Sequence, residues 1–137
     1  MQARVKWLED KTFVGQSGSG HQLVFGTGVG DGPTPGPSAM ELVLIGTGGC
    51  SAWDVVNILG KARLAVEDVT VSLDADRAET EPRVFTRVHL HFTVTGRGLD
   101  PSRVNRAVSL WLAKYCSASA MVSMTASLTH AVEIAEP

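Results

Sequence analysis

Cysteine is scarce in this chain of 137 residues, which contains only Cys50 and Cys116. Two cysteines are too few for a disulfide scaffold, and too few for a closed structural zinc site, which takes four ligands. In a cytoplasmic protein such thiols are normally kept reduced. The two residues are therefore either packing residues of the core or the carriers of a chemical function.

Charge is scarce as well, because charged residues make up 19% of the chain and the formal net charge is −2. An average soluble domain has roughly 25% charged residues, so the low value predicts that some surface is buried against another subunit. The near-neutral balance, with a pI of about 6.0, argues against a nucleic-acid partner. The 44% share of apolar residues excludes a disordered chain.

A long apolar run is missing too. The most apolar segment, residues 42–53, lies between Glu41 and Asp54 and is shorter than the roughly 20 residues that cross a bilayer. The first ten residues alternate charged with apolar side chains and contain no apolar signal core. These features predict a single domain over residues 1–137, located in the cytoplasm, with no membrane partner.

The hydrophobic periodicity predicts an α+β chain with the order βββ-α-ββ-α-α-β. The first three strands are predicted to form an antiparallel meander, and the first helix to be buried because it is apolar nearly all round. The expected strands cover residues 2–8, 12–16, 21–25, 69–76, 87–94 and 125–136, and the expected helices cover residues 38–60, 100–115 and 117–124.

Residues 26–37 form the one long stretch rich in glycine and proline. Glycine-rich loops can bind phosphate, but here no Lys-Ser or Lys-Thr pair follows and the spacing is not that of a nucleotide-binding fingerprint. We therefore predict a plain loop between the third strand and the first helix.

Both cysteines lie beside irregular features of the sequence. Cys50 follows Gly46, Gly48 and Gly49, each of which costs a helix about 1 kcal/mol relative to alanine. Such glycines predict that another backbone or a ligand approaches closely. Cys116 is predicted to lie at a helix N-terminus, where the thiolate is favoured, and the neighbouring Lys114 would act in the same direction. Spacing alone leaves inert packing and chemistry equally open.

Three further polar positions are candidates. Glu41 lies nine positions before Cys50 on the same predicted helix, and nine steps of about 100° place the two side chains on opposite faces. Glu41 could therefore serve the site of another chain, or only interact with the first helical turn. His89 and His91 share one strand face and could bind a metal, although a solvated sheet face explains them as well.

Several segments resemble the OsmC/Ohr family, named for osmotic induction and organic hydroperoxide resistance. The resemblance rests on residues 37–50 (PSAMELVLIGTGGC), residues 85–92 (FTRVHLHF) and residues 114–117 (KYCS), in the same order as in the family. The start of the chain and residues 19–22 (SGHQ) are most similar to the YhfA-like branch of that family.

The resemblance implies an OsmC-like fold in an intertwined homodimer, with long central helices sandwiched by antiparallel sheets. It also implies a thiol-dependent peroxidase that reduces organic or hydrogen peroxides. Cys50 would attack the peroxide, Cys116 would resolve the resulting sulfenic acid as a disulfide, and a dithiol reductant would reopen it. Glu41 would come from the partner subunit. No metal, flavin or haem is implied.

Two departures from the family pattern keep other functions open. Peroxidase members carry an arginine in the first hairpin, where this chain has Lys11, and their glutamate aligns with Met40 rather than Glu41. The first alternative is a non-catalytic or redox-responsive small-molecule-binding protein of the same fold. The second is a cysteine hydrolase that pairs Cys50 with a histidine such as His21.

Overall fold

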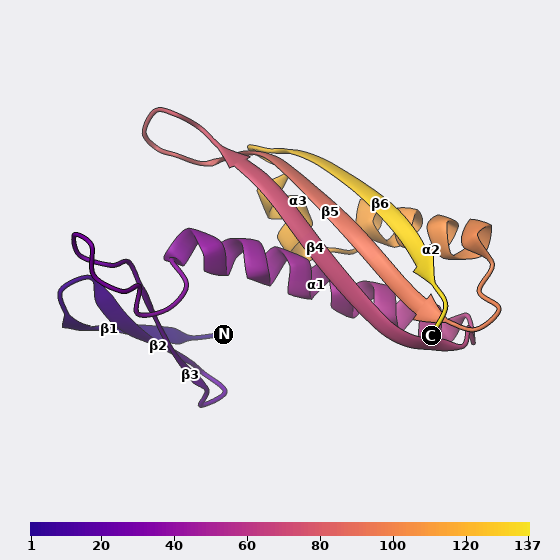
Figure 1. The fold of residues 1–137 in the computed structure, drawn as a ribbon, viewed down its shortest axis with the longest axis horizontal. Helices are drawn as coiled ribbons and strands as arrows, with labels where there is room; N and C mark the ends of the chain where they lie inside the picture. The colour runs from indigo at the N-terminus through magenta and orange to yellow at the C-terminus, as the bar shows by residue number, and fades with distance from the viewer. The chain divides into compact units, whose positions relative to one another are not determined.

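A computed structural model describes all residues from Met1 to Pro137, and its element order is the predicted βββ-α-ββ-α-α-β (Figure 1). The α+β class is therefore confirmed. The elements are β1 (Ala3–Glu9), β2 (Thr12–Ser17), β3 (Gln22–Gly26), α1 (Ala39–Lys61), β4 (Val66–Arg77), β5 (Phe85–Gly96), α2 (Pro101–Lys114), α3 (Ser117–Val122) and β6 (Ser127–Ala135).

The chain divides into two compact units, residues 1–45 and residues 46–137. The boundary lies within α1, so one continuous helix belongs to both units. No shift in composition marks this boundary in the sequence, because apolar residues continue across it.

The first unit contains a three-stranded sheet in the order β1-β2-β3, and both pairings are antiparallel, as predicted for the meander. Phe13 and Phe25 face each other across β2 and β3 with ring centroids 5.7 Å apart. The side chains of β1 are all exposed in the single chain, including those of Val5 and Trp7. This sheet therefore presents apolar side chains to solvent unless a partner covers them.

The glycine- and proline-rich segment is a loop, as predicted, since no helix or strand lies between Gly26 and Ala39. Gly26 has a φ of 148° and donates its N–H to the carbonyl of Pro37 at 2.9 Å. A Cβ at Gly26 would collide with the carbonyl oxygen of Lys11. Glycine is therefore required where the third strand turns into this loop.

A capping box begins α1. The N–H of Glu41 donates to Oγ of Ser38 at 3.1 Å, and the N–H of Ser38 donates to Oε1 of Glu41 at 3.0 Å. These bonds satisfy two donors at the helix start. The helix begins where the sequence predicts it and extends to Lys61, one residue beyond the predicted end.

Replacing Ser38 with alanine is expected to lower the free energy of unfolding by about 1 kcal/mol, because Ser38→Ala removes the capping hydroxyl. Urea unfolding followed by circular dichroism measures the change. The matched control is Ser102→Ala, an exposed position in the first turn of α2, which should stay within about 0.5 kcal/mol of the wild type. Equal midpoints for the two variants would contradict a stabilising role of the cap.

The second unit contains a sheet in the order β4-β5-β6. Strands β4 and β5 are antiparallel, with Val71 opposite Phe92, whereas β5 and β6 are parallel, with Phe92 opposite Val132. The sheet is thus mixed, while the resemblance implies antiparallel sheets. The connection through α2 and α3 explains the parallel pair, because a helical crossover returns the chain to the end of the sheet where β5 began.

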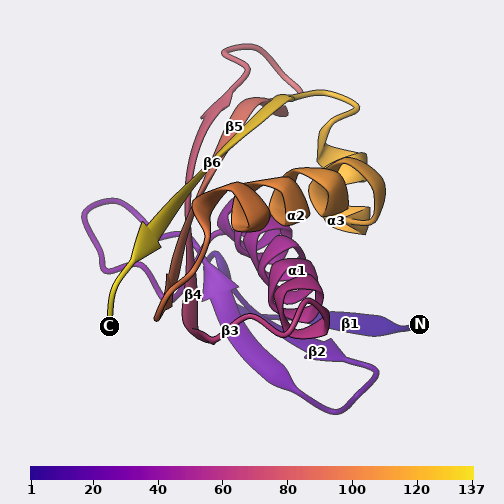
Figure 2. The same cartoon turned by 90° about the vertical axis from the view of Figure 1, so that its right-hand side faces the viewer.

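The core of the second unit lies between this sheet and the helices. Alternate residues of β5 are buried, as their spacing predicts, and Val104 and Val108 of α2 are buried as well. Helix α2 and the part of α1 from Gly46 onward lie on the same face of the sheet (Figure 2). The aliphatic and aromatic side chains that are fully or almost fully buried are Val55, Leu59, Val88, Leu90, Phe92, Val94, Val104 and Val108.

Helix α1 is buried on one face only in the single chain, so the prediction of burial all round is wrong for one copy. Ser51, Asp54 and Val55 are buried, whereas Trp53 is 68% exposed and Val56 is exposed too. By length and composition alone the 23-residue helix could also span a membrane. The apolar core helices of other folds meet the same criterion, so this finding does not distinguish a membrane from a protein partner.

Candidate functional site

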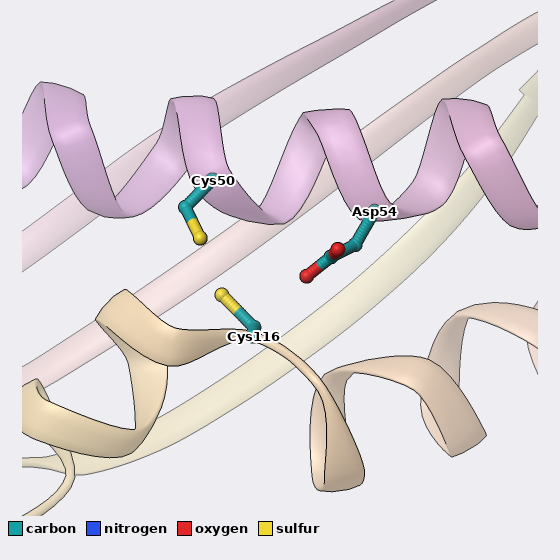
Figure 3. Close-up of side chains that lie close together, drawn as sticks. All are labelled: Cys50, Asp54 and Cys116. Atoms are coloured by element: carbon teal, nitrogen blue, oxygen red, sulfur yellow. The ribbon is translucent and has the colours of Figure 1, made fainter.

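The two cysteines, distant in the sequence, lie together in the second unit. Sγ of Cys50, Sγ of Cys116 and a carboxylate oxygen of Asp54 are all within 4.8 Å of one another. Cys50 and Asp54 project from α1 toward Cys116, which lies between α2 and α3 (Figure 3). Both cysteines are free thiols. Cys116 is 2% exposed while Cys50 is half-buried, so a molecule from solvent reaches Cys50 first.

The end of α2 places Cys116. Tyr115 caps α2 by donating its N–H to the carbonyl of Trp111 at 2.8 Å, and Cys116 then serves as the N-cap of α3. Its sulfur accepts a hydrogen bond from the N–H of Ser119 at 3.5 Å. The prediction of a cysteine at a helix N-terminus is confirmed. Lys114, the predicted neighbouring cation, lies 5.2 Å from the ring centroid of Tyr115.

The three glycines before Cys50 differ in what lies close to them. A Cβ at Gly48 would meet Cδ1 of Leu73 at 2.5 Å, so Gly48 allows α1 to approach β4 closely. A Cβ at Gly46 or Gly49 would meet nothing within 4 Å in the single chain. The predicted close approach is therefore confirmed for Gly48, and the other two glycines face open space.

Two buried serines surround the Cys116 sulfur. Oγ of Ser51 lies 3.2 Å from Sγ of Cys116 and 3.2 Å from Oγ of Ser119, and it donates to the carbonyl of Thr47 at 2.9 Å. Ser51 has a single hydroxyl proton, so it donates to Thr47 or to the Cys116 sulfur, but not to both at once. Ser51 can therefore donate to the Thr47 carbonyl when Cys116 is a thiol and to the Cys116 sulfur when it is a thiolate.

The environment moves the pKa values of the two thiols in opposite directions. Burial by itself raises the pKa of Cys116, but hydrogen bonds from Ser119, Ser51 and Cys50 lower it below that of an ordinary thiol. The backbone of Ala118 lowers the pKa of Cys50, but burial, the bond with Cys116 and the charges of Cys116 and Asp54 raise it overall. Of the two thiols, Cys116 is therefore the one that ionises more readily.

Replacing Asp54 with asparagine is expected to lower the pKa of Cys50. The negative charge of Asp54 disfavours a thiolate beside it, so Asp54→Asn favours ionisation of Cys50. Alkylation of Cys50 by iodoacetamide near pH 7, followed by peptide mass, should become faster, since the thiolate is the nucleophile. Asp68→Asn removes an exposed carboxylate from β4 and is the control. A slower or unchanged rate in D54N would contradict this electrostatic role.

The acid beside the cysteines is Asp54, which in the sequence marks only the end of an apolar run. Its side chain is 6% exposed and its Oδ2 has no hydrogen-bond partner. A signal was present in the sequence, because Asp54 follows Cys50 by four positions and so shares its helix face. The carboxylate of Glu41, the acid that was singled out, forms the capping box with Ser38.

The histidines singled out in the sequence have ordinary partners. Nδ1 of His89 lies 2.6 Å from Oγ1 of Thr129, and Nε2 of His91 lies 3.1 Å from Oε2 of Glu133. Each thus bonds a different residue of β6, which agrees with a solvated sheet face. His21 bonds Oγ of Ser19 through Nδ1 at 3.0 Å. The groups that meet at Cys50 are a thiol and a carboxylate, with no imidazole among them.

The α+β fold with paired cysteines at a central helix defines the class of protein. The chain matches the family described as OsmC-like protein over residues 30–131, and it belongs to that family. It is 50% identical to protein YhfA of Escherichia coli strain K12 over 134 residues, which are 98% of each chain. Family membership and the cysteine pair indicate a redox-related role.

Solved structures agree with this assignment. A hypothetical protein from Aquifex aeolicus VF5 is 28% identical, with a TM-score of 0.83 and coverage of 99% of this chain and 96% of that one. An organic hydroperoxide resistance protein OsmC from Legionella pneumophila is 15% identical, with a TM-score of 0.72 and coverage of 96% and 95%. At that identity the second likeness shows the fold alone.

Proposed function

We propose that this protein is a cytoplasmic thiol-dependent peroxidase that reduces organic peroxides, and hydrogen peroxide as a second substrate. The observation that carries the proposal is the meeting of the half-buried Cys50 with the buried Cys116. One thiol is accessible to substrate and the other is protected until the first has reacted. This asymmetry is what a peroxidatic cysteine and a resolving cysteine require.

The reaction begins with a proton transfer between the two cysteines, because Cys116 ionises more readily than Cys50. The Cys50 proton passes to the Cys116 thiolate, and the Cys50 thiolate then attacks the outer peroxide oxygen. The O–O bond breaks, the leaving alkoxide takes the proton from Cys116, and Cys50 becomes a sulfenic acid. The Cys116 thiolate attacks that sulfur, a disulfide forms, and hydroxide leaves and is protonated to water. An external dithiol returns two electrons and two protons.

The proposal includes a homodimer. In the single chain, Gly49, Trp53, Val56 and Gly60 follow one another at helical spacing on the exposed face of α1. An apolar stripe with glycines that have open space above them suits the close approach of a second helix. The low share of charged residues and the exposed apolar side chains of β1 also favour a dimer.

Glu41 enters the proposal through the dimer, in which each chain would supply Glu41 to the site of the other. Glu41→Gln keeps an oxygen acceptor for the N–H of Ser38, so the cap is expected to remain while the charge is lost. A fall in kcat at unchanged stability, measured by peroxide consumption and urea unfolding, would report the catalytic role. Unchanged kcat would restrict Glu41 to capping.

The test is to mix the reduced protein with one equivalent of cumene hydroperoxide, to follow peroxide loss by stopped flow and to count free thiols. Fast loss of both thiols, with a Cys50–Cys116 disulfide found by peptide mass, is the expected result. A rate no faster than that of an ordinary free cysteine would overturn the peroxidase proposal.

One observation favours the second candidate, a redox-responsive binding protein without turnover. The raised pKa of Cys50 means that the accessible thiol is protonated more than an ordinary cysteine, which slows attack on peroxide. In that case the pair would still oxidise to a disulfide, but slowly and without a catalytic cycle.

A further inference from the structure

The proposed peroxidase reaction gives no role to the carboxylate of Asp54. Its side chain is 6% exposed, and its Oδ2 is buried without a hydrogen-bond partner. A buried carboxylate without a partner is costly, and such groups are usually paired or bind a cation. Within the cluster its neighbours are two sulfur atoms, which are weak hydrogen-bond donors as thiols and repel a carboxylate as thiolates unless a cation lies between them.

We infer that the reduced site binds one zinc ion per chain through Sγ of Cys50, Sγ of Cys116 and a carboxylate oxygen of Asp54. Two thiolates select a borderline-soft ion such as Zn²⁺ over Mg²⁺ or Ca²⁺, which prefer oxygen ligands. Three protein ligands leave the fourth tetrahedral position for water, as in open zinc sites. This inference does not depend on the proposed peroxidase activity.

The geometry is close to that of such a site. Ligand atoms at about 2.0–2.3 Å from a tetrahedral zinc ion lie roughly 3.5–3.8 Å from one another. The three atoms here lie within 4.8 Å of one another, so each pair has to approach by no more than about 1.3 Å. Cys50 and Asp54 are one turn apart on α1, a rigid element, and both project toward Cys116 (Figure 3).

The surroundings of Cys116 suit a metal-bound thiolate. The N–H of Ser119 and the hydroxyl of Ser51 both lie at hydrogen-bond distance from its sulfur. Such donors orient a ligand and stabilise its charge. Half-buried Cys50 provides the entry for the ion. Zinc binds both sulfurs as thiolates and so releases their protons, and the affinity should therefore rise with pH.

Zinc and peroxide would compete for the same atoms. Oxidation by a peroxide takes two electrons from the thiolate pair, forms the S–S bond and gives an alcohol and water once two protons are taken up. Both thiolate ligands are lost in that step, so the oxidised protein should release the ion. Bound zinc should in turn protect the thiols.

The experiment uses the reduced full chain, freed of reductant and kept without oxygen. Titration with Co²⁺ is expected to produce sulfur-to-cobalt charge-transfer absorption that saturates at one ion per chain and disappears on addition of equimolar Zn²⁺. Zinc affinity is then measured against a chromophoric chelator. Asp54→Asn should weaken it about tenfold or more, while the matched control D68N, with an exposed carboxylate, should bind like the wild type.

Two further samples make the test independent of folding defects in D54N. Cys116→Ser should lose most of the charge-transfer absorption, and the oxidised wild type, which needs no substitution, should bind neither ion. Absence of charge-transfer absorption in the reduced wild type would overturn the inference, and so would equal zinc affinity in D54N and wild type. Peroxide-dependent thiol loss is measured on the metal-free protein. Failure of the zinc inference and failure of the peroxidase proposal can therefore be distinguished.

Discussion

Cys50→Ser is expected to reduce peroxide consumption to the rate of the buffer, whereas Cys116→Ser is expected to consume one equivalent and then stop. Serine is not ionised near neutral pH, so C50S has no nucleophile for the peroxide oxygen. C116S keeps the accessible thiol but lacks the sulfur that would capture the sulfenic acid. The measurement is peroxide loss over many turnovers, with reductant in excess.

The trapped species distinguishes the two roles. In C116S a sulfenic acid on Cys50 should be labelled by dimedone, and the label should be absent from C50S. Circular dichroism and urea unfolding of both variants control for folding, which matters because Cys116 is almost fully buried. If C116S turned over with dithiols at the wild-type rate, Cys116 would not be the resolving thiol. If the label appeared on Cys116 in C50S, the roles would be reversed, as the lower pKa of Cys116 would then explain.

Trp53→Glu is expected to separate the proposed dimer into monomers. Trp53 is 68% exposed in the single chain, and an exposed substitution in a monomer changes stability by no more than about 0.5 kcal/mol. At an apolar interface the same change buries a carboxylate without a partner and costs several kcal/mol. Since each 1.4 kcal/mol is a factor of ten, the dissociation constant should rise by roughly a thousandfold.

Light scattering at micromolar concentration measures the effect, as a fall from twice the 14.5 kDa chain mass to one chain mass. The control is Thr80→Glu, which adds the same charge at an exposed position between β4 and β5. A wild type of one chain mass would overturn the dimer, and a dimeric W53E would place the interface elsewhere. If turnover falls together with the dimer, the site requires both chains.

Local patterns in the sequence predicted most of the fold, because each depends on neighbouring residues alone. The alternation of Val88, Leu90, Phe92 and Val94 determines which face of β5 is buried. Ser38 and Glu41 are spaced for a capping box, and Asp100 followed by Pro101 marks the start of α2. The parallel partner of β5 was not predictable in this way, because strand direction depends on the path of the α2–α3 crossover.

For the site, the residues alone identified Cys50 and Cys116 as candidates, through the glycine cluster before one and the helix start at the other. Only the tertiary structure placed their sulfur atoms together, since packing of α1 against β4 at Gly48 and the turn after α2 bring distant segments into contact. It also placed Asp54, one helical turn after Cys50, beside both sulfur atoms. That position depends on which face of α1 is buried and on what lies opposite it, and spacing along one chain does not give the second of these.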